Sequence, residues 1–167
     1  MTYSSSESAT RAQAVVTGDL VEGAALSGRA GGSEFPVGGP DGCGGTAIGP
    51  NPYDLLSASL AACTAMTIRL QARREKFPLA HVEVAVSYHH GVDGGRDSFD
   101  RAITLEGLDD RQKGVLMQAA AMCPVGRTLG LNADIRTRDS VRAAPASAPA
   151  NYEEDLRELP IPYIDAD

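Results

Sequence analysis

Residues 51–76 read NPYDLLSASLAACTAMTIRLQARREK and predict one long helix at the centre of the fold. Asn51 is a good N-cap, and Pro52 suits the first helical position. Asp54 lies in the first turn, where the helix dipole favours an acid. The helix should end near Lys76, because Pro78 cannot continue it.

This predicted helix is apolar or small on every side, since no residue between Asp54 and Arg69 is charged. A surface helix would carry one polar face. We therefore expect burial on most sides, which exceeds what one small sheet can cover and predicts a homodimer. The uncharged run, residues 55–68, is too short to cross a bilayer core of about 30 Å, so we expect no membrane span.

The rest of the chain predicts short strands and a second helix. Alternating or β-rich segments indicate strands at residues 13–17, 21–26, 33–37, 81–89, 99–106 and 133–138. A second helix should run from Asp109 to about Met122, with Gln112 completing a capping box. Strands and helices that do not alternate as β-α-β units place the chain in the α+β class.

Cys63 lies in the middle of the long helix, and Cys123 lies at a junction between helices. Because Cys123 precedes Pro124, the second helix must break there, and a short helix beginning at Pro124 would make Cys123 its N-cap. A helix N-terminus stabilises a thiolate. Either cysteine could instead be a small buried hydrophobe, as most free cysteines are.

Length and charge limit the possible classes of protein. The 167 residues suit one domain, and a net charge of −7 argues against a nucleic-acid partner. The first residues lack a secretory signal, and three cysteines do not fit a secreted disulfide framework, so we expect a cytoplasmic protein. We expect residues 1–11 to be a disordered tail, 12–139 the folded domain, and 140–167 a linker with an acidic tail.

Other polar motifs do not indicate a cofactor or a metal. The glycine-rich residues 38–49 lack the ending of a phosphate-binding loop, and Cys43 within them is expected to be an incidental thiol. The histidines, His81, His89 and His90, lack zinc-site spacing. We therefore expect the chemistry to rest on Cys63 and Cys123, which in a reducing cytosol suit a catalytic or sensing pair.

Two motifs make the chain resemble the OsmC/Ohr family. Residues 49–56, GPNPYDLL, followed by residues 61–67, AACTAMT, resemble the first family signature. Residues 122–125, MCPV, followed by residues 127–129, RTL, resemble the second, in the version of the less characterised branch. The resemblance implies a swapped homodimer with antiparallel β-sheets wrapped around central helices and two active sites near the subunit interface.

The resemblance also implies a thiol peroxidase that protects against organic hydroperoxides. Cys63 matches the peroxidatic cysteine, whose thiolate attacks the O–O bond and becomes a sulfenic acid, and Cys123 matches the resolving cysteine, which forms the disulfide. An external dithiol restores both thiols. The alternative is a redox sensor or a module that binds a small apolar ligand without efficient turnover.

A thiol in the apolar middle of a helix needs a cation, because desolvation raises its pKa. The resemblance implies an arginine from the N-terminal strands, held by a glutamate right after the helix-opening proline. Tyr53 stands at that glutamate position, and the next residue, Asp54, lies nine residues before Cys63 and so on the opposite helix face. Residues 17–20 contain no arginine. The candidate cations are Arg11, Arg29 and Arg127, the last four residues beyond Cys123. Beside the two cysteines, we expect Arg127 and Asp54 to be the catalytic residues.

Overall fold

The computed structural model describes residues 14–18, 26–38, 49–91 and 95–131. Two compact units divide these residues, one up to Asn51 and one from Pro52 onward. The predicted tails, residues 1–11 and 140–167, and the predicted strand at residues 133–138 lie outside the described residues.

The first unit contains a three-stranded antiparallel sheet in the order β1-β2-β3, formed by Ala14–Thr17, Leu26–Ala30 and Ser33–Val37. The predicted strand at residues 21–26 lies outside the described residues except for Leu26, and the described strand β2 runs from Leu26 to Ala30. Gly28 suggests a turn in sequence, but it lies opposite Phe35 in the sheet. A Cβ on Gly28 would lie 2.5 Å from the Phe35 ring, so the strand needs glycine there.

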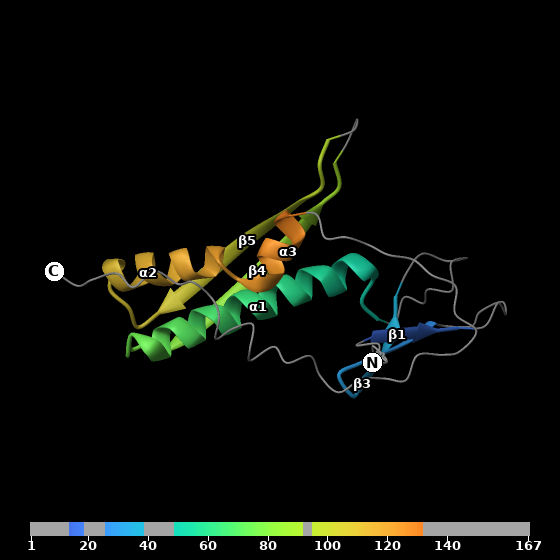
Figure 1. Cartoon of the computed structure of the whole chain (residues 1–167), viewed down its shortest axis with the longest axis horizontal. Coiled ribbons are helices and arrows are strands. Elements are labelled where there is room, and N and C mark those ends of the chain that lie inside the picture. The colour runs from blue at the N-terminus through green and yellow to red at the C-terminus, as the bar shows by residue number, and fades with distance from the viewer. Residues whose placement is uncertain (1–13, 19–25, 39–48, 92–94, 132–167) are drawn as a thin grey trace, which may run out of the picture. The chain divides into compact units, whose positions relative to one another are not determined.

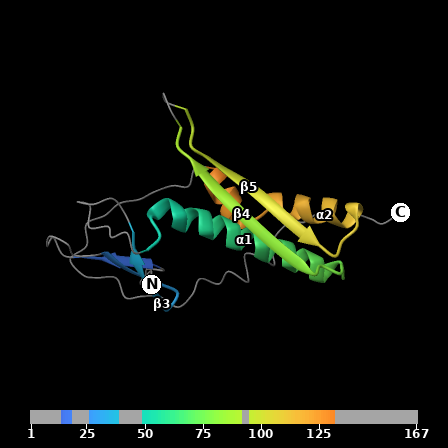
Figure 2. The same cartoon turned by 180° about the vertical axis from the view of Figure 1, so that it is seen from behind.

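The second unit confirms the α+β class. It consists of α1 (Pro52–Arg74), β4 (His81–His89), β5 (Ser98–Glu106), α2 (Asp110–Ala121) and α3 (Pro124–Gly130). The two strands pair as an antiparallel hairpin, with His81 opposite Glu106 and His89 opposite Ser98. The helices cover one face of this hairpin, as Figures 1 and 2 show from opposite sides.

The core of this unit lies between α1, α2 and the inner face of the hairpin. Ile68, Ala72, Leu116 and Ala120 are buried at its centre. Partly buried apolar side chains pack around them, namely Phe77, Leu79, Val82, Val84, Ile103, Leu105 and Leu108. The alternation of buried and exposed residues in β4 and β5 is the one that the sequence predicts.

α1 is less buried in this single chain than the sequence predicts. Tyr53, Leu56 and Met66 are exposed, at 44%, 40% and 44%. By length and composition alone α1 could cross a membrane, but it packs as a core helix against β4, α2 and α3 and buries the polar side chains Thr64, Thr67 and Gln71. The homodimer that would cover the exposed apolar residues stays a prediction.

The ends of the helices follow the predicted local chemistry. The Asp109 carboxylate accepts a hydrogen bond from the Gln112 backbone N–H at 2.8 Å, and Gln112 Oε1 accepts one from the Asp109 N–H at 3.1 Å, which confirms the capping box. Cys123 is the N-cap of α3, as predicted, with Pro124 at the first helical position.

α1 ends in a Schellman motif. The Phe77 N–H donates to the Ala72 carbonyl at 2.9 Å, and the Lys76 N–H donates to the Arg73 carbonyl at 3.3 Å. This geometry places Lys76 in the left-handed region, with φ of 55°. Glycine usually occupies this position, because a Cβ there is crowded by the following carbonyl.

Replacing Lys76 with glycine should therefore stabilise the protein. We expect Lys76→Gly to raise the free energy of unfolding by about 1 kcal/mol, because left-handed backbone costs other residues about 1–2 kcal/mol. The matched control is Arg73→Gly inside the last turn of α1, which should lower it by about 1 kcal/mol. Urea unfolding measures both changes. A loss of stability in both variants would contradict the role given to this helix end.

Candidate active site

Cys63 and Cys123 lie side by side where α1 meets α3. Cys63 is 3% exposed in the middle of α1, and Cys123 is fully buried at the start of α3. Their side chains are hydrogen-bonded to each other. Both are free thiols, so the structure shows the reduced form of the site.

Several donors surround the sulfur of Cys123. The Gly126 N–H donates to it at 3.3 Å, and the Thr64 hydroxyl lies 3.5 Å away. The guanidinium of Arg101 reaches it at 3.6 Å through Nη1. The neighbouring Val125 N–H donates instead to the Cys63 sulfur at 3.4 Å. The first turn of α3 therefore supplies a backbone donor to each of the two sulfurs.

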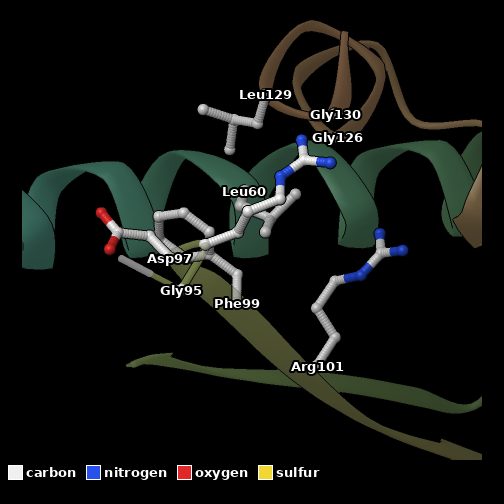
Figure 3. A pocket seen from close by; sticks show the side chains of 9 residues that line it. Leu60, Gly95, Asp97, Phe99, Arg101, Gly126, Leu129 and Gly130 are labelled. Carbon is white, nitrogen blue, oxygen red and sulfur yellow. The ribbon is translucent and has the colours of Figure 1, made fainter. Parts of the chain in front are cut away.

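Arg101 is held in place by α1 and α2. Its Nη1 donates to Thr64 Oγ1 and to the Ala120 carbonyl, each at 3.0 Å. Figure 3 shows the Arg101 side chain extending from β5 toward α1. Neither cysteine motif contains this residue, and the sequence does not predict it as a site residue. Its signal is the alternation of β5, which puts Arg101 on the same inward face as Ile103 and Leu105.

These contacts lower the pKa of Cys123 from 9.0 to about 5. The hydrogen bond from Cys63 contributes most, and burial opposes it. The hydrogen bonds from Thr64 and Gly126 and the positive charge of Arg101 lower the pKa further. Cys123 is therefore the sulfur that carries negative charge at neutral pH.

The other predicted site residues are exposed, belong to the first unit or lie outside the described residues. Arg127 has an exposed side chain on α3, and only its backbone N–H is bonded to Cys123, at the carbonyl oxygen. Asp54 is exposed in the first turn of α1. Arg29 lies on β2 in the first unit, and Arg11 lies outside the described residues. Catalytic roles for Arg127 and Asp54 stay predictions.

Tyr53 belongs to a polar and aromatic cluster at the start of α1. Its ring stacks on Tyr88 at 4.0 Å between centroids, with 13° between the planes. The Tyr88 hydroxyl donates to Asp97 Oδ2 at 3.0 Å, and its hydrogen bond with Tyr53 is the main cause of a raised pKa for Tyr88. The Gly91 N–H, donating to the other carboxylate oxygen, is the main cause of a lowered pKa for Asp97.

An open cavity of about 660 Å³ adjoins the thiol pair. That volume falls within the range of about 300–1,000 Å³ typical of small-molecule sites. Arg101 and Gly126, which contact the Cys123 sulfur, are part of its wall. Figure 3 shows the labelled residues around it. The full lining is Leu60, Gly95, Arg96, Asp97, Phe99, Arg101, Gly126, Leu129 and Gly130.

The described residues contain no group of three His, Cys, Asp or Glu side chains that could hold a metal ion. His89 and His90 are exposed and lie beside carboxylates, 3.1 Å from Asp100 and 3.1 Å from Asp97.

The family model described as OsmC-like protein matches residues 44–138, which include both cysteines of the pair. The chain belongs to the OsmC-like protein family. None of the curated proteins matches the sequence.

Several solved structures resemble the chain. A Psychrobacter arcticus protein described as an osmotic stress induced and detoxification response protein is 26% identical, with a TM-score of 0.59, and the match covers 71% of this chain and 88% of that one. An organic hydroperoxide resistance protein of Vibrio cholerae, with captopril in one of its active sites, is 25% identical, with a TM-score of 0.53 and coverage of 77% and 91%. OhrB of Bacillus subtilis, at 23% identity, TM-score 0.51 and coverage of 74% and 94%, shares the fold.

The short distance between Gly126 and the Cys123 sulfur gives a prediction for this OsmC-like site. A Cβ on Gly126 would lie 2.9 Å from that sulfur, so Gly126→Ala must displace it from its donors. We expect the pKa of Cys123 to rise above about 5, toward its ordinary value. The thiolate absorbance in the ultraviolet, followed against pH, measures this shift.

Gly130→Ala is the matched control, because a Cβ at Gly130 meets nothing within 4 Å and the residue lies on the same helix. Its thiolate titration should equal that of the unmodified protein. An unchanged titration in Gly126→Ala would show that the backbone donor does not influence the charge of Cys123.

Proposed function

We propose that this OsmC-like protein reduces organic hydroperoxides to alcohols through a two-cysteine cycle driven by an external dithiol, in defence against oxidative stress. The observation that carries the proposal is the hydrogen-bonded pair of Cys63 and Cys123, with the Arg101 guanidinium 3.6 Å from one sulfur. The names of related structures support it, since the Vibrio cholerae relative carries the description of an organic hydroperoxide resistance protein. A cytoplasmic homodimer without a metal or cofactor belongs to the same proposal.

At a pH above the lowered pKa of Cys123, the two sulfurs share one proton. When that proton lies on Cys123, Cys63 is the thiolate that attacks the outer oxygen of the hydroperoxide. The O–O bond breaks, the alkoxide takes up a proton and leaves as the alcohol, and Cys63 becomes a sulfenic acid. The Cys123 sulfur then attacks the sulfenic sulfur, hydroxide leaves and is protonated to water, and the disulfide forms.

The cavity supports an organic substrate rather than hydrogen peroxide. Leu60, Phe99 and Leu129 give its wall apolar surface, and Arg101 connects that wall to the buried sulfur of Cys123. Burying the hydrocarbon part of a hydroperoxide there would stabilise the complex by about 25 cal/mol per Å². Hydrogen peroxide has no such surface to bury.

Burial of the thiols also favours a second candidate, a redox sensor or ligand-binding module. Cys63 is only 3% exposed and Cys123 is fully buried, so a reductant reaches neither sulfur without some opening. A sensor would form its disulfide once per protein and turn over slowly. The number of turnovers separates the two functions.

A peroxidase assay with cumene hydroperoxide and dithiothreitol tests the proposed function. We expect multiple turnovers for the unmodified protein, no turnover for Cys63→Ser, and one turnover ending in a trappable sulfenic acid for Cys123→Ser. Cys43→Ser controls for the third thiol and should retain activity. Full activity in Cys63→Ser would refute the assigned mechanism, and a single turnover by the unmodified protein would favour the sensor.

A further inference from the structure

We propose that Arg101 makes Cys123 the leaving thiolate when an external dithiol reduces the Cys63–Cys123 disulfide, so that the reductant attacks the sulfur of Cys63. This inference rests on the proposed two-cysteine cycle and concerns its second half. It assigns a direction to the reduction and a positioning role to a residue outside both cysteine motifs.

The guanidinium is fixed independently of the sulfur. Nη1 carries two hydrogens, and its two bonds of 3.0 Å, to Thr64 Oγ1 and to the Ala120 carbonyl, occupy both. Thr64 is fully buried and Ala120 is 2% exposed, so neither partner is replaced easily by water. At 3.6 Å, Nη1 therefore acts on the Cys123 sulfur chiefly through its charge.

A positive charge beside a sulfur favours the form of that sulfur which carries negative charge. In the disulfide, Cys123 is neutral and gains little from Arg101. As the S–S bond breaks, charge develops on the Cys123 sulfur, and the guanidinium and the Gly126 N–H at 3.3 Å stabilise it. The lowered pKa of Cys123 agrees with this, since a thiol of lower pKa leaves faster in thiol–disulfide exchange.

The reduction balances in two exchange steps. The thiolate of the dithiol attacks the Cys63 sulfur, a mixed disulfide forms, and the S–S electron pair leaves on Cys123. The second thiol of the reductant then loses its proton and attacks the reductant's first sulfur, which is bonded to Cys63. The S–S bond breaks, and Cys63 leaves as a thiolate and takes up a proton. The dithiol is oxidised to its disulfide by two electrons, and the protein returns to one thiol and one thiolate.

The opposite pathway, in which the reductant attacks Cys123 and Cys63 is the leaving thiolate, is less favourable because of the same contacts. Both sulfurs are buried, but the Cys123 sulfur is also surrounded by Thr64, Arg101 and Gly126, so a reductant attacking it would have to displace these contacts. In this pathway the negative charge would develop on Cys63, whereas the sulfur beside the guanidinium would stay neutral in the mixed disulfide. Arg101 would therefore stabilise the leaving thiolate less.

Trapping the mixed disulfide tests the direction without any hydroperoxide. The full chain is oxidised with diamide, exposed briefly to the monothiol cysteamine, quenched with acid, alkylated and mapped by mass spectrometry. We expect cysteamine on Cys63 and an alkylated, free Cys123. Cysteamine on Cys123, equal amounts on both, or no Cys63–Cys123 disulfide after diamide would overturn the inference.

Variants of Arg101 test the positioning role. We expect Arg101→Gln to slow reduction by cysteamine severalfold, to raise the pH at which the Cys123 thiolate appears, and to weaken the preference for Cys63. Arg101→Lys, which keeps the charge, should restore part of each effect. Arg111→Gln is the matched control, because it removes one positive charge from an exposed position on α2 outside the cavity lining, and it should change none of these three results.

If Arg101 had a merely structural role, Arg101→Gln would leave cysteamine on Cys63 and the titration of Cys123 unchanged, and Arg101→Lys would restore nothing. That result would refute the inference. The outcome is separable from the proposed function. A protein that directs cysteamine to Cys63 but does not turn over hydroperoxides would retain this inference and lose the peroxidase.

Discussion

One nitrogen atom, Nη1 of Arg101, connects most of the second unit. It extends from β5, donates to a hydroxyl on α1 and a carbonyl on α2, and lies beside the sulfur that caps α3. A charged group in a partly buried place is costly unless it is bonded, and removing one partner of such a set typically costs several kcal/mol. The contacts of Arg101 Nη1 therefore help to hold β5 against the three helices. The same nitrogen also influences the charge of the thiol pair.

Sequence reasoning locates the helices and the hairpin well because local chemistry determines them. Pro52 begins α1, Asp109 and Gln112 cap α2, and Cys123 before Pro124 begins α3. Period-two alternation gives β4 and β5. The strand β2 is harder to predict, because the glycine within it suggests a turn, whereas in the sheet Gly28 lies opposite Phe35 on the next strand, which no local pattern reveals.

The residues around the two cysteines are harder to predict than the cysteines themselves. The two motifs indicate Cys63 and Cys123, but Arg101 lies in neither, and helix spacing instead favours Arg127, four residues beyond Cys123. Which guanidinium reaches a sulfur depends on how β5 crosses the helices, and that is a property of the assembled core. The inward position of Arg101 among apolar residues of a half-buried strand was the available signal. Tyr53, at a position where the resemblance implies a glutamate, instead stacks on Tyr88.

The Thr64 hydroxyl has one proton and two acceptors within reach, the Leu60 carbonyl at 2.7 Å and the Cys123 sulfur at 3.5 Å. Its lone pairs already accept from Arg101, so only the direction of that proton is free to change. A negative sulfur attracts the proton, whereas a disulfide sulfur, being a poor acceptor, leaves it to the backbone of α1. One hydroxyl proton therefore cannot serve the backbone of α1 and the Cys123 sulfur at the same time, and the charge of that sulfur is set in competition with a carbonyl of the helix that carries Cys63.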